Sequence, residues 1–238
     1  MKNIPAIVGA MDSEIALYLE HSILLNEVKW NEFTFYEVSL DGNECVICKS
    51  GIGKVLAAMI CQKLIDLYEP SSILFTGVAG ALNPVLDIGD VVVSRDCIQH
   101  DIDGRPLGFE RGRILFSDDK IFRADPKLVE LTLQASVNNH KMIPGRILTG
   151  DQFFTHKDIE EHDYILTELK GDCIEMEGAA IAVVCTKNRV PFVIVRTVSD
   201  KADGSAVEDF SKLHHLVAGN SYAIVRQLLP ELEKLSQR

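Results

Sequence analysis

The sequence lacks the segments that direct proteins to membranes or to nucleic acid. Its 238 residues contain no run of Lys or Arg, and the formal net charge is −11. The amino-terminal apolar run, which Asp12 and Glu14 end, is too short for a signal peptide, and no later apolar run is long enough to span a bilayer. An anionic surface repels phosphate backbones and acidic lipid, so we expect a cytoplasmic protein that binds neither nucleic acid nor membranes.

Signs of a disulfide framework or of a metal site are also missing. The six cysteines are scattered through apolar segments, which predicts buried free thiols in a reducing compartment. Cys45 and Cys48 form a C-x-x-C motif, but "NECVICKS" has the composition of a strand, where residues three apart point to opposite faces. The pair therefore cannot share a metal, and the seven histidines show no ligand spacing. We expect no metal and no cofactor.

The order of the predicted elements indicates the fold class. No Pro/Ser-rich linker, internal repeat or charge block divides the chain, so residues 1–238 are predicted to form one domain. Strand-like and helix-like stretches alternate, which predicts an α/β fold: a three-layer sandwich with a twisted, mixed but mainly parallel sheet flanked by helices. Strands are expected within residues 4–11, 33–40, 44–50, 71–82, 89–101, 141–154 and 190–200. Helices are expected to begin near residue 12 and to lie within 53–70, 125–139 and 210–235. Residues 172–188 are expected to form a short strand that leads into a helix. The irregular loop 101–113 is a candidate binding segment.

Small and acidic residues gather where four predicted strands end. These stretches are Gly9–Glu14, Thr76–Gly80, Glu175–Glu177 and Arg196–Asp200. Ligands of such sheets bind outside the carboxyl ends of the strands, so three of the stretches bring carboxylates to one rim while the glycines clear space for a ligand. This convergence predicts a binding site.

Two simpler interpretations of these acids remain open. Asp12, Glu14 and Glu177 stand near helix starts, where the helix dipole favours any acid. Carboxylate oxygens also bind Mg²⁺, although no aspartate-rich or phosphate-cradling motif accompanies them here.

Cleavage of a glycosidic bond is one reaction that needs this set of residues. One acid protonates the leaving group, a second activates water, and the negative charge favours an oxocarbenium-like transition state. A further acid can hold the diol of a ribose, and an aromatic residue such as Phe153 or Phe154 can stack on a flat base.

Seven motifs, spread over nearly the whole chain and in matching order, resemble those of the 5′-methylthioadenosine/S-adenosylhomocysteine nucleosidases. They are "IVGAMDSE", "SGIGKVLAA", "TGVAGAL", "GDVVVS", "TGDQFF", "IEMEGAAIAVVC" and "VPFVIVRTVSDKAD". The resemblance implies a nucleoside-phosphorylase-like α/β sandwich and a homodimer. It also implies hydrolysis of the N-glycosidic bond of adenine nucleosides that carry a 5′-thioether.

The resemblance also implies the catalytic roles. Glu14 in "GAMDSE" would activate the attacking water, and Asp200 in "TVSDKAD" would protonate N7 of the leaving adenine, with Ser199 beside it. Arg196 would orient the acids and the water. Many members have Ser where this chain has Val78, so Asp200 is expected to be held by the backbone or by Ser199 instead.

Substrate contacts are implied in the same way. Glu177 would bond the ribose hydroxyls, and Met176 would pack on the sugar. Phe153 would stack on the base, the Phe154 backbone would bond its edge, and Gly80 would line the base site.

The 5′ substituent would contact residues of both subunits. Met11, Ile52 and Phe210 would face it, together with the partner subunit's Leu107 and the partner subunit's Phe109. The loop "HDIDGRPLGFE" that carries the last two also resembles that of members acting on 6-amino-6-deoxyfutalosine, a second candidate substrate.

Two alternative functions have to be weighed. A purine nucleoside phosphorylase shares the fold but uses phosphate as the nucleophile, and phosphate needs cationic donors where this chain offers Asp12 and Glu14. A non-catalytic nucleoside-binding or storage protein is the alternative from another class, and it would leave Glu14 and Asp200 without a task. The sequence favours the hydrolase.

Overall fold

The computed structural model describes residues 3–137, 139–154, 156–200 and 206–236. Its strands are β1 (Ala6–Gly9), β2 (Ser22–Trp30), β3 (Phe33–Leu40), β4 (Asn43–Lys49), β5 (Ile73–Ala81), β6 (Val91–Gln99), β7 (Phe122–Arg123), β8 (Met142–Thr149), β9 (Cys173–Glu175) and β10 (Phe192–Asp200). The helices are α1 (Asp12–Glu20), α2 (Lys54–Tyr68), α3 (Pro126–Gln134), α4 (His156–Glu161), α5 (Tyr164–Thr167), α6 (Gly178–Asn188) and α7 (Ala206–Ser236), with one 3₁₀ turn, η1 (Arg105–Leu107).

The strands form one mixed sheet in the order β10-β6-β8-β9-β5-β1-β4-β3-β2, with β7 beside β6. Because β10 also pairs with β5, the strands β5, β10, β6, β8 and β9 close into a ring, whereas β1 to β4 extend from it as an open sheet. The ring brings the ends of β5, β8, β9 and β10 together at one rim. In its register Asp200 lies opposite Gly80, Gly80 opposite Ile174, and Thr149 opposite Glu175.

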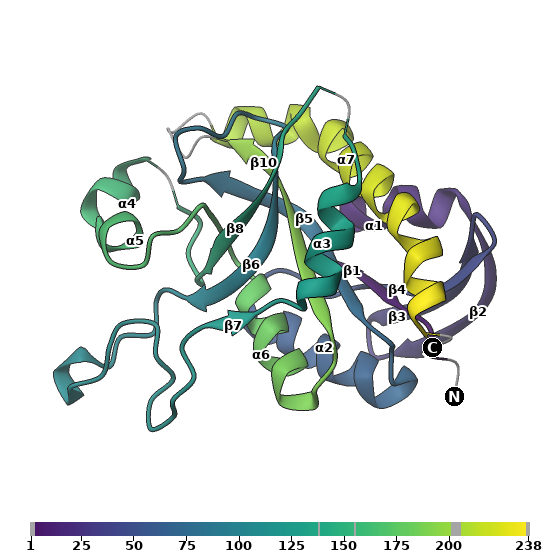
Figure 1. Ribbon diagram of the computed structural model, residues 1–238, viewed down its shortest axis with the longest axis horizontal. Helices are drawn as coiled ribbons and strands as arrows, with labels where there is room; N and C mark the ends of the chain where they lie inside the picture. Colours follow the sequence, from purple (N-terminus) through teal and green to yellow (C-terminus); the bar gives the residue numbers. More distant parts are fainter. Residues whose placement is uncertain (1–2, 138, 155, 201–205, 237–238) are drawn as a thin grey trace.

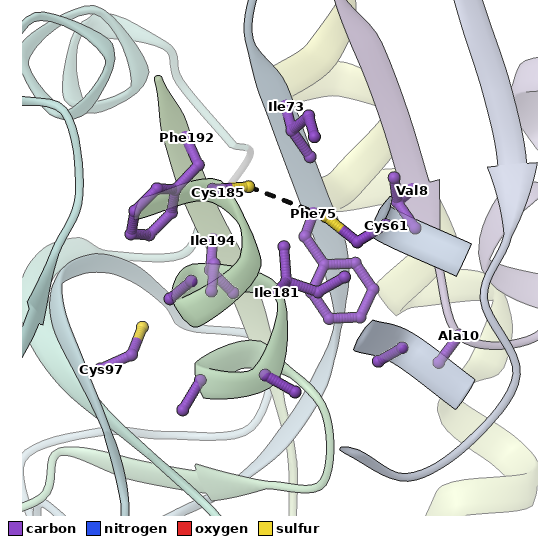
Figure 2. Packing of buried hydrophobic residues seen from close by; sticks show 14 of the residues in the cluster. Val8, Ala10, Cys61, Ile73, Phe75, Cys97, Ile181, Cys185, Phe192 and Ile194 are labelled. Carbon is purple, nitrogen blue, oxygen red and sulfur yellow. Dashed lines mark hydrogen bonds between the residues drawn. The ribbon is translucent and has the colours of Figure 1, made fainter. Parts of the chain in front are cut away.

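Helices cover the sheet on both faces, which gives the expected three layers (Figure 1). Helices α2 and α6 pack on one face around a core that includes Phe75 and Ile194, as Figure 2 shows. Helices α1, α3 and α7 cover the other face, where Leu74 and Val193 are buried. Neighbouring residues on β5 and β10 thus enter opposite cores, as the period of two in a strand requires.

The cysteines follow the same alternation. Cys45 and Cys48 of β4 are buried in the two different cores, so the C-x-x-C pair is split by the sheet. All six cysteines are free and buried. Cys61 of α2 and Cys185 of α6 face each other across the helix contact, with their Sγ atoms 3.8 Å apart (Figure 2).

The structure also contains elements that the sequence patterns did not predict. Strand β2 was missed because most of its residues are exposed, including Ile23 and Leu24, so it carries no alternating apolar signal. Helices α4 and α5 and strand β7 are too short to carry a period. None of the described helices combines the length and the apolar composition needed to cross a membrane.

Candidate active site

A cleft opens at the rim where β1, β5, β9 and β10 end. Ten of the residues expected at the site line it: Met11, Glu14, Ile52, Gly80, Phe153, Phe154, Met176, Glu177, Ser199 and Asp200. Val78 and Glu175 line it as well. The side chains come from segments far apart in the sequence, and the closed ring of strands places them on one opening.

Glu14 lies on the buried floor of this cleft, in the first turn of α1. Its Oε2 accepts hydrogen bonds from the backbone N–H groups of Ala10 (2.6 Å) and Met11 (3.0 Å). The bond from Met11, the N-cap residue, is part of the capping box of α1 and gives Glu14 a local role at the helix start. Its Oε1 accepts a third bond, from the Val78 N–H of β5 (3.2 Å), which capping does not need. Burial raises the pKa of Glu14 above its ordinary value, against the opposing effects of Arg196 and the three amides.

Asp12 behaves differently from Glu14. Its side chain is exposed and pairs with Lys49 of β4 at 2.8 Å. It does not line the cleft, so of the two acids in the first loop only Glu14 reaches the site.

Gly77 is the reason that Glu14 and Arg196 can lie close together. A Cβ atom on this residue would stand 2.5 Å from Arg196 Nη1 and 2.5 Å from Glu14 Oε1. Such distances are impossible between non-bonded atoms, so any larger residue would push the two charged groups apart. The sequence motif placed Gly77 beside the site but gave it no role.

Arg196 is the buried cation behind the cleft. Its side chain is 1% exposed and lies over the Phe75 ring at 4.1 Å. It donates from Nη2 to Glu175 Oε2 (2.5 Å), and Nη2 also lies 3.8 Å from Glu177 Oε2. Burial lowers the pKa of Arg196, but the surrounding carboxylates outweigh it and the net shift is upward. Arg196 therefore holds Glu175 from behind the cleft and is not part of the cleft wall.

Glu175 belongs to a stretch that was expected at the rim, but it was given no role of its own, although it links the site to the fold. Its carboxylate accepts from the Gly178 N–H (2.7 Å) and the Glu177 N–H (3.1 Å) at the start of α6, and from the Thr149 hydroxyl. With Arg196 these partners satisfy a nearly fully buried charge. The "IEMEG" stretch contained this residue, but only the fold shows that its partner is Arg196, 21 residues away.

Glu177 carries the third buried carboxylate of the cleft. Its Oε1 accepts the Gly53 N–H at 2.8 Å. Burial, together with the charge of Glu175, raises the pKa of Glu177 to about 7. A carboxyl group with these properties can accept or donate hydrogen bonds to the hydroxyls of a sugar near neutral pH.

Asp200 ends β10 next to an irregularity in the strand. The register with β5 shifts between Val198 and Asp200, so Ser199 is an extra residue on β10. In a regular strand neighbouring side chains point apart, but at this bulge Ser199 and Asp200 both line the cleft. The Ser199 hydroxyl donates to Asp200 Oδ2 at 2.9 Å. That bond holds the acid in a chain where Val78 offers no side-chain partner.

The two phenylalanines after β8 lie in different environments. Phe153 is 49% exposed at the mouth of the cleft, whereas Phe154 is buried and packs edge-on against His100 at 5.1 Å. Phe153 thus has a free ring face, and Phe154 anchors the segment. Ile52, 55% exposed, faces the cleft from the loop before α2.

Leu107 and Phe109, which were predicted to contact the 5′ substituent in the partner subunit's cleft, do not line the cleft of this chain. Leu107 is 65% exposed, and Phe109 packs on Phe116 at 5.3 Å. Both belong to the long segment between β6 and β7 that extends from the body (Figure 1). Phe210 belongs to α7, but its side chain lies outside the described residues. Among the side chains that are described, no group of three or more His, Cys, Asp or Glu is arranged to hold a metal ion.

Comparison with known proteins defines the class of this fold and site. The sequence model of the phosphorylase superfamily matches residues 5–230. A 5′-methylthioadenosine/S-adenosylhomocysteine nucleosidase of Anoxybacillus flavithermus is 34% identical over 232 residues, covering 96% of this chain and 99% of that protein.

Solved structures agree with the sequence comparison. The nucleosidase of the same name from Colwellia psychrerythraea, in complex with adenine, superimposes with a TM-score of 0.90 at 32% identity, covering 98% of this chain and 96% of that one. The futalosine hydrolase of Helicobacter pylori gives a TM-score of 0.87 at 30% identity, covering 96% and 98%. The chain belongs to the 5′-methylthioadenosine/S-adenosylhomocysteine nucleosidase family, whose members are N-glycosidic hydrolases.

Proposed function

We propose that the protein hydrolyses the N-glycosidic bond of 5′-methylthioadenosine and S-adenosylhomocysteine, with Glu14 as the general base and Asp200 as the general acid. The observation that carries this proposal is the carboxylate of Glu14. It is fixed by three backbone amides, two from its own loop and one from β5, and burial raises its pKa. A fixed base whose pKa is raised toward neutrality is suited to accept a proton from water.

The reaction balances with these two residues. Glu14 takes a proton from water as the water oxygen forms a bond to C1′ of the ribose. The bond between C1′ and N9 of adenine breaks, and its electron pair moves into the base. Asp200, held by the Ser199 hydroxyl, gives its proton to N7, so that adenine leaves as a neutral molecule. The anionic cleft favours the cationic sugar of the transition state.

The remaining residues of the cleft hold the substrate in this proposal. Glu177 binds the ribose hydroxyls, and Met176 packs on the sugar. Phe153 offers its exposed face to the adenine ring, Gly80 lines the base site, and the Phe154 backbone bonds the edge of the base. Met11 and Ile52 are apolar residues at the opening and suit a thioether tail.

A phosphorylase is less compatible with the cleft. Its described lining contains Glu14, Glu175, Glu177 and Asp200 but no Lys or Arg. Among the described residues, the buried cation Arg196 lies behind the wall and is already engaged by Glu175. The described part of the cleft therefore offers a phosphate dianion a negative site without a free cationic donor.

Adenine release from methylthioadenosine, followed by chromatography with and without added phosphate, tests the proposal. We expect adenine and free methylthioribose at a rate that phosphate does not change. Turnover that scales with phosphate and yields a sugar 1-phosphate would identify a phosphorylase. Binding without product would identify a nucleoside-binding protein.

A second substrate is favoured by one comparison. The futalosine hydrolase of Helicobacter pylori matches this chain over nearly its full length. We therefore include 6-amino-6-deoxyfutalosine as a candidate substrate of the same site. Rates on both nucleosides under the same conditions measure the preference.

A homodimer that completes each cleft is part of the proposal. The segment between β6 and β7 extends from the body and exposes Leu107 and Phe116, which are 65% and 85% accessible (Figure 1). Exposed apolar groups on an extended loop are costly unless a partner covers them. Leu107 and Phe109 would then cover the 5′ end of the cleft of the other subunit. Sedimentation that finds a fully active monomer would contradict this.

A cytoplasmic location is proposed on the state of the thiols. All six cysteines are free, and none is exposed. Such a set is typical of a reducing compartment. Fractionation of the producing cells measures the location directly.

A further inference from the structure

We propose that Lys54 is a positioning residue: its ion pairs with Asp101 and Asp151, here called the latch, hold together the two loops that border the mouth of the cleft. This inference rests on the proposed function. One loop, residues 50–53, carries Ile52, and the other, residues 150–154, carries Phe153. Lys54, Asp101 and Asp151 lie outside the cleft lining, where the two loops meet.

The ammonium group of Lys54 joins three segments of the chain. Its Nζ lies 2.7 and 2.8 Å from the two carboxylate oxygens of Asp101, which follows β6. It also lies 3.2 Å from Oδ2 of Asp151, which follows β8. Backbone bonds reinforce the junction, since the Asp151 N–H donates to Asp101 Oδ2 at 3.0 Å and the Lys54 N–H points at Asp151 Oδ1 at 3.4 Å.

The position of Lys54 in its helix has no local explanation. Lys54 is the first residue of α2, where the helix dipole disfavours a positive charge. Its side chain is nevertheless only 15% exposed and extends toward the two aspartates. A residue that violates a local rule in this way usually answers a tertiary requirement. Here that requirement is two carboxylates that would otherwise repel each other across the loop junction.

The electrostatics agree with a tight junction. Burial raises the pKa of Asp101, but hydrogen bonds from Lys54 and from the Asp151 amide, together with the charge of Lys54, outweigh it and lower the pKa below its ordinary value. The ion pair is therefore retained over the neutral pH range. Without Lys54 the two aspartates would face each other uncompensated.

The latch acts on the substrate through the residues beside it. Immediately before Lys54, the Gly53 N–H donates to Glu177 Oε1, the carboxylate proposed to hold the ribose. Gly51 and Gly53 both have positive φ, so the path of this loop requires glycines, and the Gly51 N–H also donates to the Ala10 carbonyl at 3.1 Å. Phe153 follows Asp151 by two residues. Glu14 and Asp200 are held elsewhere, by the amides of Ala10, Met11 and Val78 and by Ser199. Loss of the latch should therefore weaken binding more than chemistry.

The test compares Lys54→Met, Lys54→Arg and a matched control, Lys141→Met. Nζ of Lys141 also lies between two aspartates, 3.3 Å from Asp90 and 3.8 Å from Asp87, but it touches neither loop. Initial rates of adenine release give KM and kcat. For Lys54→Met we expect KM to rise about tenfold or more while kcat stays within about threefold of wild type. Lys54→Arg should recover most of the loss because a guanidinium can bridge the same carboxylates, and Lys141→Met should change neither constant.

Several results would overturn the latch. Lys54→Met with a KM within about twofold of wild type would do so, as would a fall in kcat alone. If Lys54→Met does not fold, Asp151→Asn takes its place, because Asp151 is 58% exposed and its loss removes only one arm of the junction. An unchanged KM in Asp151→Asn would then refute the proposal. Failure of the proposed function is recognised separately, because wild-type protein would release no adenine and both inferences would fall together.

Discussion

Replacing Gly77 with Ala would test whether the close approach of Glu14 and Arg196 organises the site. The added Cβ would lie 2.5 Å from Arg196 Nη1, 2.5 Å from Glu14 Oε1 and 3.1 Å from the carboxyl carbon of Glu14. An ordinary contact needs more than about 3.4 Å, so one or both groups must move by about 1 Å. Neither moves freely, because three amides hold Glu14 and Glu175 holds Arg196.

We expect Gly77→Ala to lower both the free energy of unfolding and the catalytic rate. Overpacking of this kind destabilises a protein by about 1–3 kcal/mol, partly offset by the loss of about 0.4–1 kcal/mol of chain entropy in the unfolded Ala variant. A misplacement of 1 Å at a catalytic group can cost about 10²-fold in rate. We therefore expect Gly77→Ala to lose activity far out of proportion to its loss of stability.

The assay pairs kcat for adenine release with a thermal midpoint. Gly219→Ala is the control, because Gly219 lies in α7 and a Cβ there would meet no atom within 4 Å. In Gly219→Ala the free energy of unfolding should rise by up to about 1 kcal/mol, because Ala has a higher helix propensity than Gly, and the activity should stay unchanged. Gly77→Ala with wild-type kcat and midpoint would refute the argument that Gly77 sets the distance between the two charged groups.

Three further variants follow from the same geometry. Glu14→Gln should lower kcat by about 10²–10⁴-fold and abolish the acidic limb of the pH profile, which in wild type falls as pH drops through the raised pKa of Glu14. The pKa of Glu14 is higher in the folded than in the unfolded chain, so ionisation of Glu14 above pH 4.5 lowers the free energy of unfolding. The neutral Gln variant should therefore not be less stable at pH 7, and a sharp drop in its thermal midpoint would contradict the raised pKa. Asp200→Asn keeps the shape of the acid but carries no transferable proton, so kcat should fall by about 10²–10⁴-fold with little change in binding; a kcat within a few-fold of wild type would exclude Asp200 as the acid. Arg196→Met leaves Glu175 buried without its cation and should cost about 3–5 kcal/mol in denaturant unfolding, whereas an unchanged midpoint concentration would show that Thr149 and the amides suffice.

The elements that could be predicted from the sequence are those with a strong local pattern of apolar residues. The strands β1, β5 and β10 are runs buried on both faces, and α2 and α7 have clear apolar periodicity, so their sequences were enough. Strand β2, most of whose residues are exposed, carries no such pattern. The pairing of β10 with β5 and β6 at once, which closes the ring, depends on contacts between segments more than 90 residues apart.

Sequence by itself determined which chemical groups reach the rim. Acids and glycines stand near the ends of strands, which is a local property, and the resemblance of the motifs to those of the family singled out Glu14, Glu177 and Asp200 among these acids. Tertiary structure decided what each group does there. It gave Glu14 the amide of Val78, paired Arg196 with Glu175, made Gly77 the spacer between two charges and placed Lys54 between Asp101 and Asp151. Burial, charge pairing and the resulting pKa values depend on neighbours in space, and the chain acquires those neighbours only when the ring of strands closes.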